Sequence, residues 1–234
     1  MPNKITSWSF SRYSTYKLCP FKAKCAFILK IKEPGNKAMQ RGALVHDSAR
    51  DFIFGITKTV PVELEHFKDL FKQLQQRYKL KINGMTVEQT WAFTKDWQDT
   101  VWNDWDNCWV RIKLDCAYQL TDTLLVIPDW KTGKFREEMN DDYVEQLELY
   151  ALAALLKHPW VEEVRPRLVY LDQSIIYPDP DDPIIFTQDD VPMLKKLWEG
   201  RVKKMLSDTV FAPRPNDKCR YCFYSANQNG PCKF

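Results

Sequence analysis

The sequence contains no long hydrophobic segment. No run of apolar residues approaches the ~18–20 residues that a membrane-spanning helix requires. Residues 1–5 are also too polar to begin a secretory signal. Both absences argue against a membrane or exported protein, so we expect a cytoplasmic protein that has no membrane partner.

Internal repeats, low-complexity tracts and long linkers are also missing from the 234 residues. A chain of this length buries roughly 70% of its unfolded surface and can form one core without disulfides. We therefore predict a single domain over residues 1–234. It would have a mainly helical part (1–83), a sheet with a helix (84–172), and a C-terminal helix with a cysteine-rich tail (187–234).

The net charge of +3 is small, but the charges are unevenly distributed. Residues 1–50 carry ten Lys/Arg and two Asp/Glu, and residues 195–234 carry nine and three. The centre is therefore acidic. Solvated helix faces would account for this pattern. Alternatively, the two basic ends meet in space and form a face for a polyanion.

The hydrophobic period changes along the chain from helical to strand-like and back. Ser9 or Ser11 can cap a first helix, and Pro20 can begin the next. Further helices are predicted at about 39–55, 62–81, 141–157 and 189–207, and Thr187 would cap the last of them. Strands are predicted at 87–93, 109–118, 123–130, 167–172 and 184–186. Helices that flank a mixed sheet define an α/β fold. The buried stripe expected on the helix over 39–55 is Leu44, Val45, Ala49, Phe52 and Ile53.

Seven cysteines, an odd number, argue against a disulfide framework in a chain without an export signal. Three of them form the pattern Cys219-x2-Cys222-x9-Cys232 near the end of the sequence. Two thiolates in a Cys-x2-Cys turn can share one metal centre. The tail therefore supplies three ligands of a metal site that needs a fourth.

The stretch PDWKTGK (128–134) ends a predicted strand and turns at Gly133. Asp129 and Lys131 point to the same face of that strand because side chains alternate. A hairpin with its turn at residues 121–122 can bring Asp115, on the preceding strand, beside Asp129. Two carboxylates and an ammonium suit Mg²⁺ or Mn²⁺, with the lysine orienting a water. From spacing alone, a partly exposed salt bridge to Lys131 is the simpler interpretation.

Two neighbouring helices carry polar residues that could join this group. Gln146 and Tyr150 lie four residues apart and share one helix face. The pattern Arg41-Gly42-x3-His46 places an imidazole on an earlier helix, where it could reach the same metal. Taken singly, each of these residues is more often a structural polar residue than part of a site.

Taken in order, these residues resemble the motifs of the RecB-type nucleases of the PD-(D/E)xK superfamily. The matching segments are RGALVH (41–46), Asp115, DWKTG (129–133) and QLELY (146–150). The resemblance implies a restriction-endonuclease-like mixed sheet flanked by helices, with residues 84–172 as its catalytic part. It also implies hydrolysis of DNA phosphodiesters with Mg²⁺ or Mn²⁺.

The resemblance assigns a metal site to His46, Asp115 and Asp129, with Glu88 of VEQTWAF as a further ligand. One departure is Ile112, where relatives often have a glycine three residues before the first aspartate. It leaves the proposed ligands in place and affects only a close approach of the backbone.

The resemblance also assigns catalytic roles to the neighbours of these ligands. Lys131 would assist the attacking water, and Gln146 and Tyr150 would support the site or contact DNA. Together with Asp115 and Asp129, these residues form the expected catalytic set. We interpret Pro128 as coincidental, despite the name of the superfamily.

A subset of the family, which includes the AddB subunit and the CRISPR-associated RecB-like exonucleases, binds a [4Fe-4S] cluster. YSTYKLCP supplies Cys19, and Cys219, Cys222 and Cys232 supply the other ligands that this resemblance implies. The cluster would join the N- and C-terminal segments and place the two basic ends side by side. Zn²⁺ is a less favoured occupant, because four cysteines suit either group.

We therefore expect a metal-dependent DNA exonuclease or end-processing nuclease from a bacterial, archaeal or virus-infected cell. Its DNA would have a free end or be single-stranded. Most tryptophans before Asp115 are expected in the core, and one or two could stack on bases: Trp91, Trp97, Trp102, Trp105 and Trp109. The alternatives are a structural zinc protein and a non-catalytic DNA-binding or assembly module that works with recombination or CRISPR-adaptation proteins.

Overall fold

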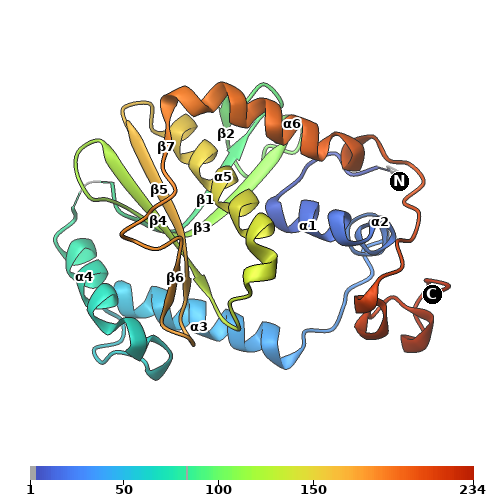
Figure 1. The fold of residues 1–234 in the computed structure, drawn as a ribbon, viewed down its shortest axis with the longest axis horizontal. Coiled ribbons are helices and arrows are strands. Elements are labelled where there is room, and N and C mark those ends of the chain that lie inside the picture. Colours follow the sequence, from blue (N-terminus) through green and yellow to red (C-terminus); the bar gives the residue numbers. More distant parts are fainter. Residues whose placement is uncertain (1–3, 83) are drawn as a thin grey trace. The chain divides into compact units, whose positions relative to one another are not determined.

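The computed structural model describes residues 4–82 and 84–234, which form helices around a mixed β-sheet (Figure 1). The chain divides into two compact units. The sheet unit comprises Gly35–Trp91 and Ile112–Lys195, and the terminal unit comprises Met1–Pro34, Ala92–Arg111 and Lys196–Phe234. The predicted α/β class, a mixed sheet flanked by helices, is confirmed.

The sheet unit is built on a hairpin followed by a parallel crossover. Strands β3 (Val110–Gln119) and β4 (Leu124–Lys131) are antiparallel, with Tyr118 opposite Val126. Strand β5 (Glu163–Tyr170) is parallel to β4 along its whole length. The other strands are β1 (Thr86–Phe93), β2 (Asp99–Thr100), β6 (Ile175–Tyr177) and β7 (Phe186–Thr187), in the order β2-β1-β3-β4-β5-β6, with β7 also on β5. The two strands pair at Tyr118–Val126 and Gln119–Leu125, and nearer their other ends Trp130 N of β4 donates to Asp115 Oδ2 of β3 at 2.8 Å.

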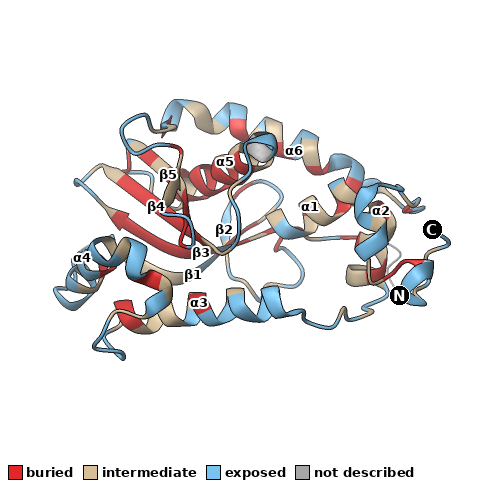
Figure 2. Ribbon diagram, turned by 60° about the horizontal axis from the view of Figure 1, so that its bottom comes forward, coloured by how far each residue is buried: buried red, intermediate tan, exposed pale blue. Residues whose placement is uncertain are grey.

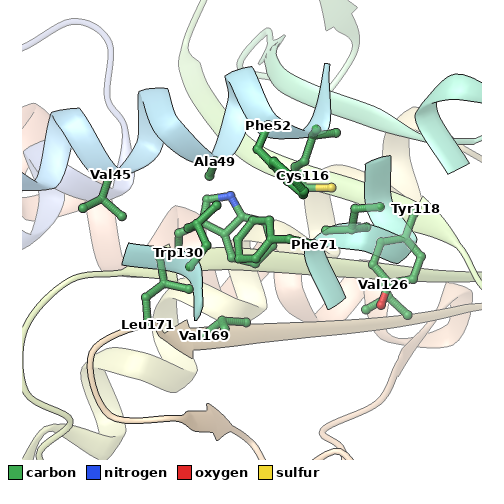
Figure 3. Close-up of a cluster of buried hydrophobic side chains, with 13 residues drawn as sticks. Val45, Ala49, Phe52, Phe71, Cys116, Tyr118, Val126, Trp130, Val169 and Leu171 are labelled. Atoms are coloured by element: carbon green, nitrogen blue, oxygen red, sulfur yellow. The ribbon is translucent and has the colours of Figure 1, made fainter. Parts of the chain in front are cut away.

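One face of this sheet packs against α3 (Lys37–Ile53) and α4 (Lys68–Lys79). The Trp130 ring lies 4.8 Å from the Phe71 ring, measured between centroids, in the cluster drawn in Figure 3. The other face packs against α5 (Asn140–Lys157), whose Leu147 is fully buried with Leu168 of β5. Figure 2 shows the resulting pattern, with buried residues along β4, β5 and α5 and exposed residues on α3 and α4. Strand β4 is therefore covered on both faces, so polar groups there need partners.

Two expectations about the helices are wrong in detail. Leu44 is 66% exposed, because it lies about 100° around α3 from the buried Val45. The predicted helix over 62–81 begins as a 3-10 turn (Val62–Phe67), in which Leu64 N donates to Pro61 O at 3.0 Å. This tighter turn buries Leu64 completely, so the α-helical period starts only at residue 68.

The terminal unit begins with two short helices that the sequence predicts. Ser9 caps α1 (Phe10–Leu18) by accepting from Arg12 N at 3.3 Å, and Pro20 begins α2 (Pro20–Ala23). A π-helical turn (Lys24–Ile28) follows. The predicted cap Thr187 forms a capping box with Asp190 before α6 (Val191–Ser207), which continues into the terminal unit.

Within the terminal unit, the tail contacts the N-terminal segment at several points. Asn216 Nδ2 donates to Leu18 O at 3.4 Å, and the hydroxyl of Tyr224 donates to Ile31 O at 2.9 Å. The two ends of the chain therefore lie side by side in this unit, as the blue and red segments of Figure 1 show. The tail itself contains only the 3-10 turns Asp217–Tyr221 and Ala226–Gln228.

The core of the terminal unit is aromatic. The Trp8 ring stacks on Trp198 at 5.2 Å between centroids and meets Trp109 edge-on at 5.3 Å. Trp97 is also buried, as the sequence predicts for most tryptophans, whereas Trp105 is 77% exposed. Among residues 4–82 and 84–234, no helix combines the length and the apolar character that a membrane crossing demands.

Asp208 fastens α1 to the segment that follows α6. Its carboxylate accepts from the Tyr16 hydroxyl at 2.7 Å, from Val210 N at 2.8 Å and from Phe211 N at 2.9 Å. Burial favours the neutral acid, but these donors hold the pKa of Asp208 below its ordinary value. The ionised form is therefore the one that stabilises the fold.

Replacing Asp208 by Asn should lower the free energy of unfolding by about 1 kcal/mol near neutral pH. Because the pKa of Asp208 is lowered on folding, its contribution is complete above the unfolded pKa of about 4. It is lost as the pH falls through the folded pKa, so the wild type and Asp208→Asn should converge in acid. Urea unfolding at pH 7 and in acid tests this, with Asp182→Asn as the control on an exposed loop. Parallel pH profiles for wild type and Asp208→Asn would contradict it.

Candidate active site

Asp129 and Lys131 lie at the C-terminal end of β4 and share one face of the strand, as predicted. Asp129 is buried, and its Oδ2 lies 2.6 Å from Lys131 Nζ. Trp130, between them, points into the hydrophobic core on the opposite face. Gly133 has a φ of +117°, which favours glycine, so the chain can turn directly after the lysine.

Helix α5 supplies the partners of this pair. Gln146 Oε1 accepts from Lys131 Nζ at 3.0 Å, and Gln146 Nε2 donates to the Tyr150 oxygen at 2.7 Å. The Tyr150 hydroxyl donates to Asp129 Oδ1 at 2.6 Å. The spacing of four residues on one helix face thus brings an amide and a phenol to the same carboxylate and ammonium.

Asp115 lies on β3 and is buried as well. Its Oδ2 accepts from Trp130 N at 2.8 Å, and its Oδ1 lies 3.0 Å from Nδ1 of His46 on α3. His46 is half-buried. The predicted imidazole therefore does reach the first of the two predicted aspartates.

Glu88 joins the same group from β1. One ligand atom from each of His46, Glu88 and Asp115 can be chosen so that all three lie within 4.8 Å of one another. Glu88 has a φ of +53°, an unusual left-handed conformation for a strand residue that costs on the order of 1 kcal/mol. Such strain is common where a side chain is directed into a site. Glu88 Oε2 also lies 2.5 Å from Nζ of Lys113.

The pKa values of the site residues are shifted because several carboxylates lie close together. Burial and the nearby Asp129 raise the pKa of Asp115, although the contact with His46 opposes this. Burial lowers the pKa of His46, but Asp115, Asp129 and Glu88 more than offset this and raise it. Burial and the charge of Asp129 raise the pKa of Tyr150 well above its ordinary value, so it remains a hydrogen-bond donor.

A hard divalent cation fits this set of side chains. Carboxylate oxygens are the preferred ligands of Mg²⁺ and Mn²⁺, and imidazole is compatible with Mn²⁺. Asp129 Oδ2 is buried and has no hydrogen-bond partner among the described residues, although the Lys131 ammonium lies close by. A cation would therefore offset the repulsion between Asp115 and Asp129, whose Oδ2 has only the Lys131 ammonium beside it.

Two residues near the site were not predicted from the sequence. Asp172, which follows β5, accepts from both Nη atoms of Arg41 at 2.8 and 2.6 Å and from Gly133 N at 3.1 Å. It joins α3 to the turn after Lys131, and no local pattern indicates this contact. Lys113, by contrast, lies two residues before Asp115 on the same strand, so the alternation of side chains could have indicated it.

The cysteines of the predicted cluster all belong to the terminal unit. Cys19 Sγ accepts from Arg214 N at 3.4 Å, and Cys219 Sγ accepts from Asn216 N at 3.3 Å. Burial raises the pKa of the neighbouring Cys25 thiol to about 11, helped by Cys232, Cys222 and Cys19. Among the described residues, however, no three of these cysteines bring their sulfurs within 4.8 Å of one another.

Comparison with known proteins agrees with this geometry. The model of the PD-(D/E)XK nuclease superfamily matches residues 7–226. No curated protein matches the sequence. A crystal structure of a predicted exonuclease from Eubacterium rectale has a TM-score of 0.50 and 11% identity, and the match covers 96% of this chain and 88% of that chain. The structure of SSO0001 has a TM-score of 0.43 and 14% identity, and the match covers 99% of this chain and 88% of that chain. The first likeness shows the fold alone, and the second is too weak to support an argument.

Replacing Tyr150 by Phe removes the hydroxyl that orients Asp129 and leaves the buried ring in place. Loss of such a supporting partner should weaken Mn²⁺ binding by about 10–100-fold. Isothermal titration calorimetry at neutral pH measures this directly, without any DNA. The matched control is Tyr78→Phe on the exposed side of α4, which should bind Mn²⁺ as the wild type does. Equal affinities of Tyr150→Phe and wild type would show that Asp129 does not depend on this bond.

Proposed function

Because the chain belongs to the PD-(D/E)XK nuclease superfamily, we propose that it is a metal-dependent DNA exonuclease or end-processing nuclease. The observation that carries the proposal is the pair of buried Asp129 and half-buried Lys131, held in place by Gln146 and Tyr150. A lysine whose only role was to neutralise an acid would not need its ammonium fixed by an amide oxygen. The fixed ammonium suits a group that must meet a reacting water in one position.

The residues that would hold the metal are Asp115 and Asp129, with His46 and Glu88 as further ligands. A bound Mg²⁺ or Mn²⁺ supplies positive charge to the phosphate and lowers the pKa of a water in its shell. Trp130 N donates to Asp115 Oδ2, and the Tyr150 hydroxyl donates to Asp129 Oδ1. Each bond keeps its carboxylate in a fixed direction. The two carboxylates therefore need little reorganisation when the cation enters.

Hydrolysis adds a water oxygen to phosphorus and breaks one phosphorus–oxygen ester bond. The attacking water loses a proton, and the leaving oxygen gains one. Lys131 Nζ, as an ammonium, would orient this water and stabilise the negative charge that develops during the attack, while the proton of the water passes to solvent. Gln146 Oε1 fixes the direction of the ammonium, and α5 fixes Gln146.

We also propose that Cys19, Cys219, Cys222 and Cys232 hold a [4Fe-4S] cluster, with Zn²⁺ as the less favoured occupant. Their donor chemistry suits either group, and backbone N–H groups already reach two of the sulfurs, as is common around thiolate ligands. A cluster there would tie residue 19 to residue 219 and restrict the unfolded chain, in addition to its own binding energy.

The nuclease is tested by replacing Lys131 with Ala. Loss of this positioned positive charge should reduce cleavage of end-labelled DNA in the presence of Mn²⁺ by about 10²–10³-fold. Binding of the same DNA in EDTA should change little. Lys134→Ala, which removes an exposed lysine three residues later, is the matched control and should retain cleavage. Full activity of Lys131→Ala would refute the assignment, and absence of cleavage by the wild type would favour a non-catalytic DNA-binding module.

The cluster is tested by purification without oxygen, followed by an absorption spectrum and by iron and sulfide analysis. The expected result is a brown protein with iron and acid-labile sulfide in equal amounts, both lost when Cys222 is replaced by Ser. Cys108→Ser, at a buried cysteine outside the set, should keep both. A colourless protein that contains zinc would exclude the iron–sulfur cluster, and Asp129 and Lys131 would be unaffected by that result.

A further inference from the structure

The segment that follows β5 holds the loop after Lys131 at two points. Asp172 Oδ2 accepts from Gly133 N at 3.1 Å, and the side-chain oxygen of Gln173 accepts from Phe135 N. Gly133 has a φ of +117°, and a Cβ built on it would meet no atom of the described residues within 4 Å. Packing therefore does not fix the backbone at this glycine, which is the most flexible residue type. The carboxylate of Asp172 supplies the restraint instead.

Arg41 of α3 fixes the orientation of that carboxylate. Its Nη1 and Nη2 atoms donate to Asp172 Oδ2 and Oδ1 at 2.8 and 2.6 Å, and such a two-point pairing restricts both planar groups. Arg41 and the N–H of Gly133 hold the pKa of Asp172 below its ordinary value, although burial opposes this, so the carboxylate is ionised at neutral pH. We call Arg41, Asp172 and Gly133 the clamp.

The clamp joins two parts of the proposed active site. Gly133 follows Lys131 by two residues, and Arg41 precedes His46 by five residues on α3, or about 7.5 Å along the helix axis. The side chain of Asp172 therefore ties the loop beside the lysine to the helix that carries the imidazole. The side chains of Arg41 and Asp172 are 49% and 30% exposed, and ion pairs this exposed add little to stability. The effect of the clamp is therefore on position.

We propose that Asp172 is a positioning residue for Lys131. Through Gly133 it fixes the backbone next to the lysine, and through Arg41 it fixes that backbone relative to α3. The ammonium end of Lys131 is held by its contacts within the site, whereas the clamp acts on the other end of this long side chain. A displacement of about 1 Å in a reacting group can cost about 10²-fold in rate. The inference rests on the proposed function, because the lysine is positioned for that reaction.

Hydrogen–deuterium exchange tests whether the clamp holds the loop. At pH 7, Asp172→Ala should exchange the amides of residues 131–136 about tenfold faster than the wild type, because Gly133 N loses a charged acceptor. The matched control is Asp47→Ala, which removes an exposed carboxylate that pairs with Arg50 within α3 itself. It should leave this exchange unchanged. The same exchange rate in Asp172→Ala and the wild type would overturn the inference.

Steady-state cleavage of end-labelled DNA with Mn²⁺ tests whether catalysis depends on the clamp. Asp172→Ala should lower kcat by about 10–100-fold and leave KM within about twofold of the wild type, because position and not substrate binding is lost. Asp172→Asn should recover part of kcat, because its amide oxygen can still accept from Gly133 N. Asp47→Ala should match the wild type, and thermal unfolding checks that each variant is folded. An unchanged kcat in Asp172→Ala, or equal losses in Asp172→Ala and Asp172→Asn, would contradict the proposal.

A double-mutant cycle shows whether the effect passes through Lys131. In a Lys131→Ala background, Asp172→Ala should change the residual single-turnover rate by less than about twofold, because the group that it positions is already absent. An undiminished loss in that background would show that Asp172 acts on another part of the site, and the assignment to Lys131 would fail.

The outcome can be separated from that of the catalytic proposal. If the wild type cuts DNA and Lys131→Ala does not, but Asp172→Ala cuts like the wild type, the nuclease stands and the positioning role fails. If the wild type cuts no DNA, the nuclease fails and the positioning role fails with it, whatever the exchange of the loop shows.

Discussion

The repulsion between two buried aspartates is the constraint on which the rest of the site depends. Asp115 on β3 and Asp129 on β4 are both buried, and the charge of Asp129 raises the pKa of Asp115. A backbone N–H, a phenol, an imidazole and an ammonium each offset part of this repulsion, and each comes from an element whose position the sheet fixes. Helices α3 and α5 thus have an electrostatic as well as a packing role, because they deliver His46 and Tyr150 to this pair.

The parts of this arrangement that the sequence could predict are those with local causes. Alternation along β4 places Asp129 beside Lys131, a short turn sets the hairpin register, and the helical repeat brings Gln146 and Tyr150 to one face. The α/β class followed from the same periods. The order of these motifs also indicated the PD-(D/E)XK nuclease superfamily, whose family model matches residues 7–226.

The parts that the sequence could not predict depend on contacts between distant segments or on unusual backbone. The left-handed conformation of Glu88 and the clamp from Arg41 through Asp172 to Gly133 leave no periodic signal. Leu44 is apolar yet exposed, because a helical period alone does not fix the width of the buried stripe. Each compact unit consists of segments that are distant in the sequence, so local patterns could not predict the division into two units. The uneven charge distribution was compatible with the two ends meeting in one unit.

The contact between Lys113 and Glu88 has a consequence for how a metal enters. The ammonium of Lys113 is a counter-ion for the Glu88 carboxylate, which the proposed metal would share. If the proposed site takes up a metal at Glu88, the uptake would be an exchange of one cation for another rather than a simple addition. A monovalent ion gains little by such an exchange, whereas a divalent ion gains the attraction of the remaining acids as well. Lys113 would therefore favour divalent over monovalent ions at the proposed site.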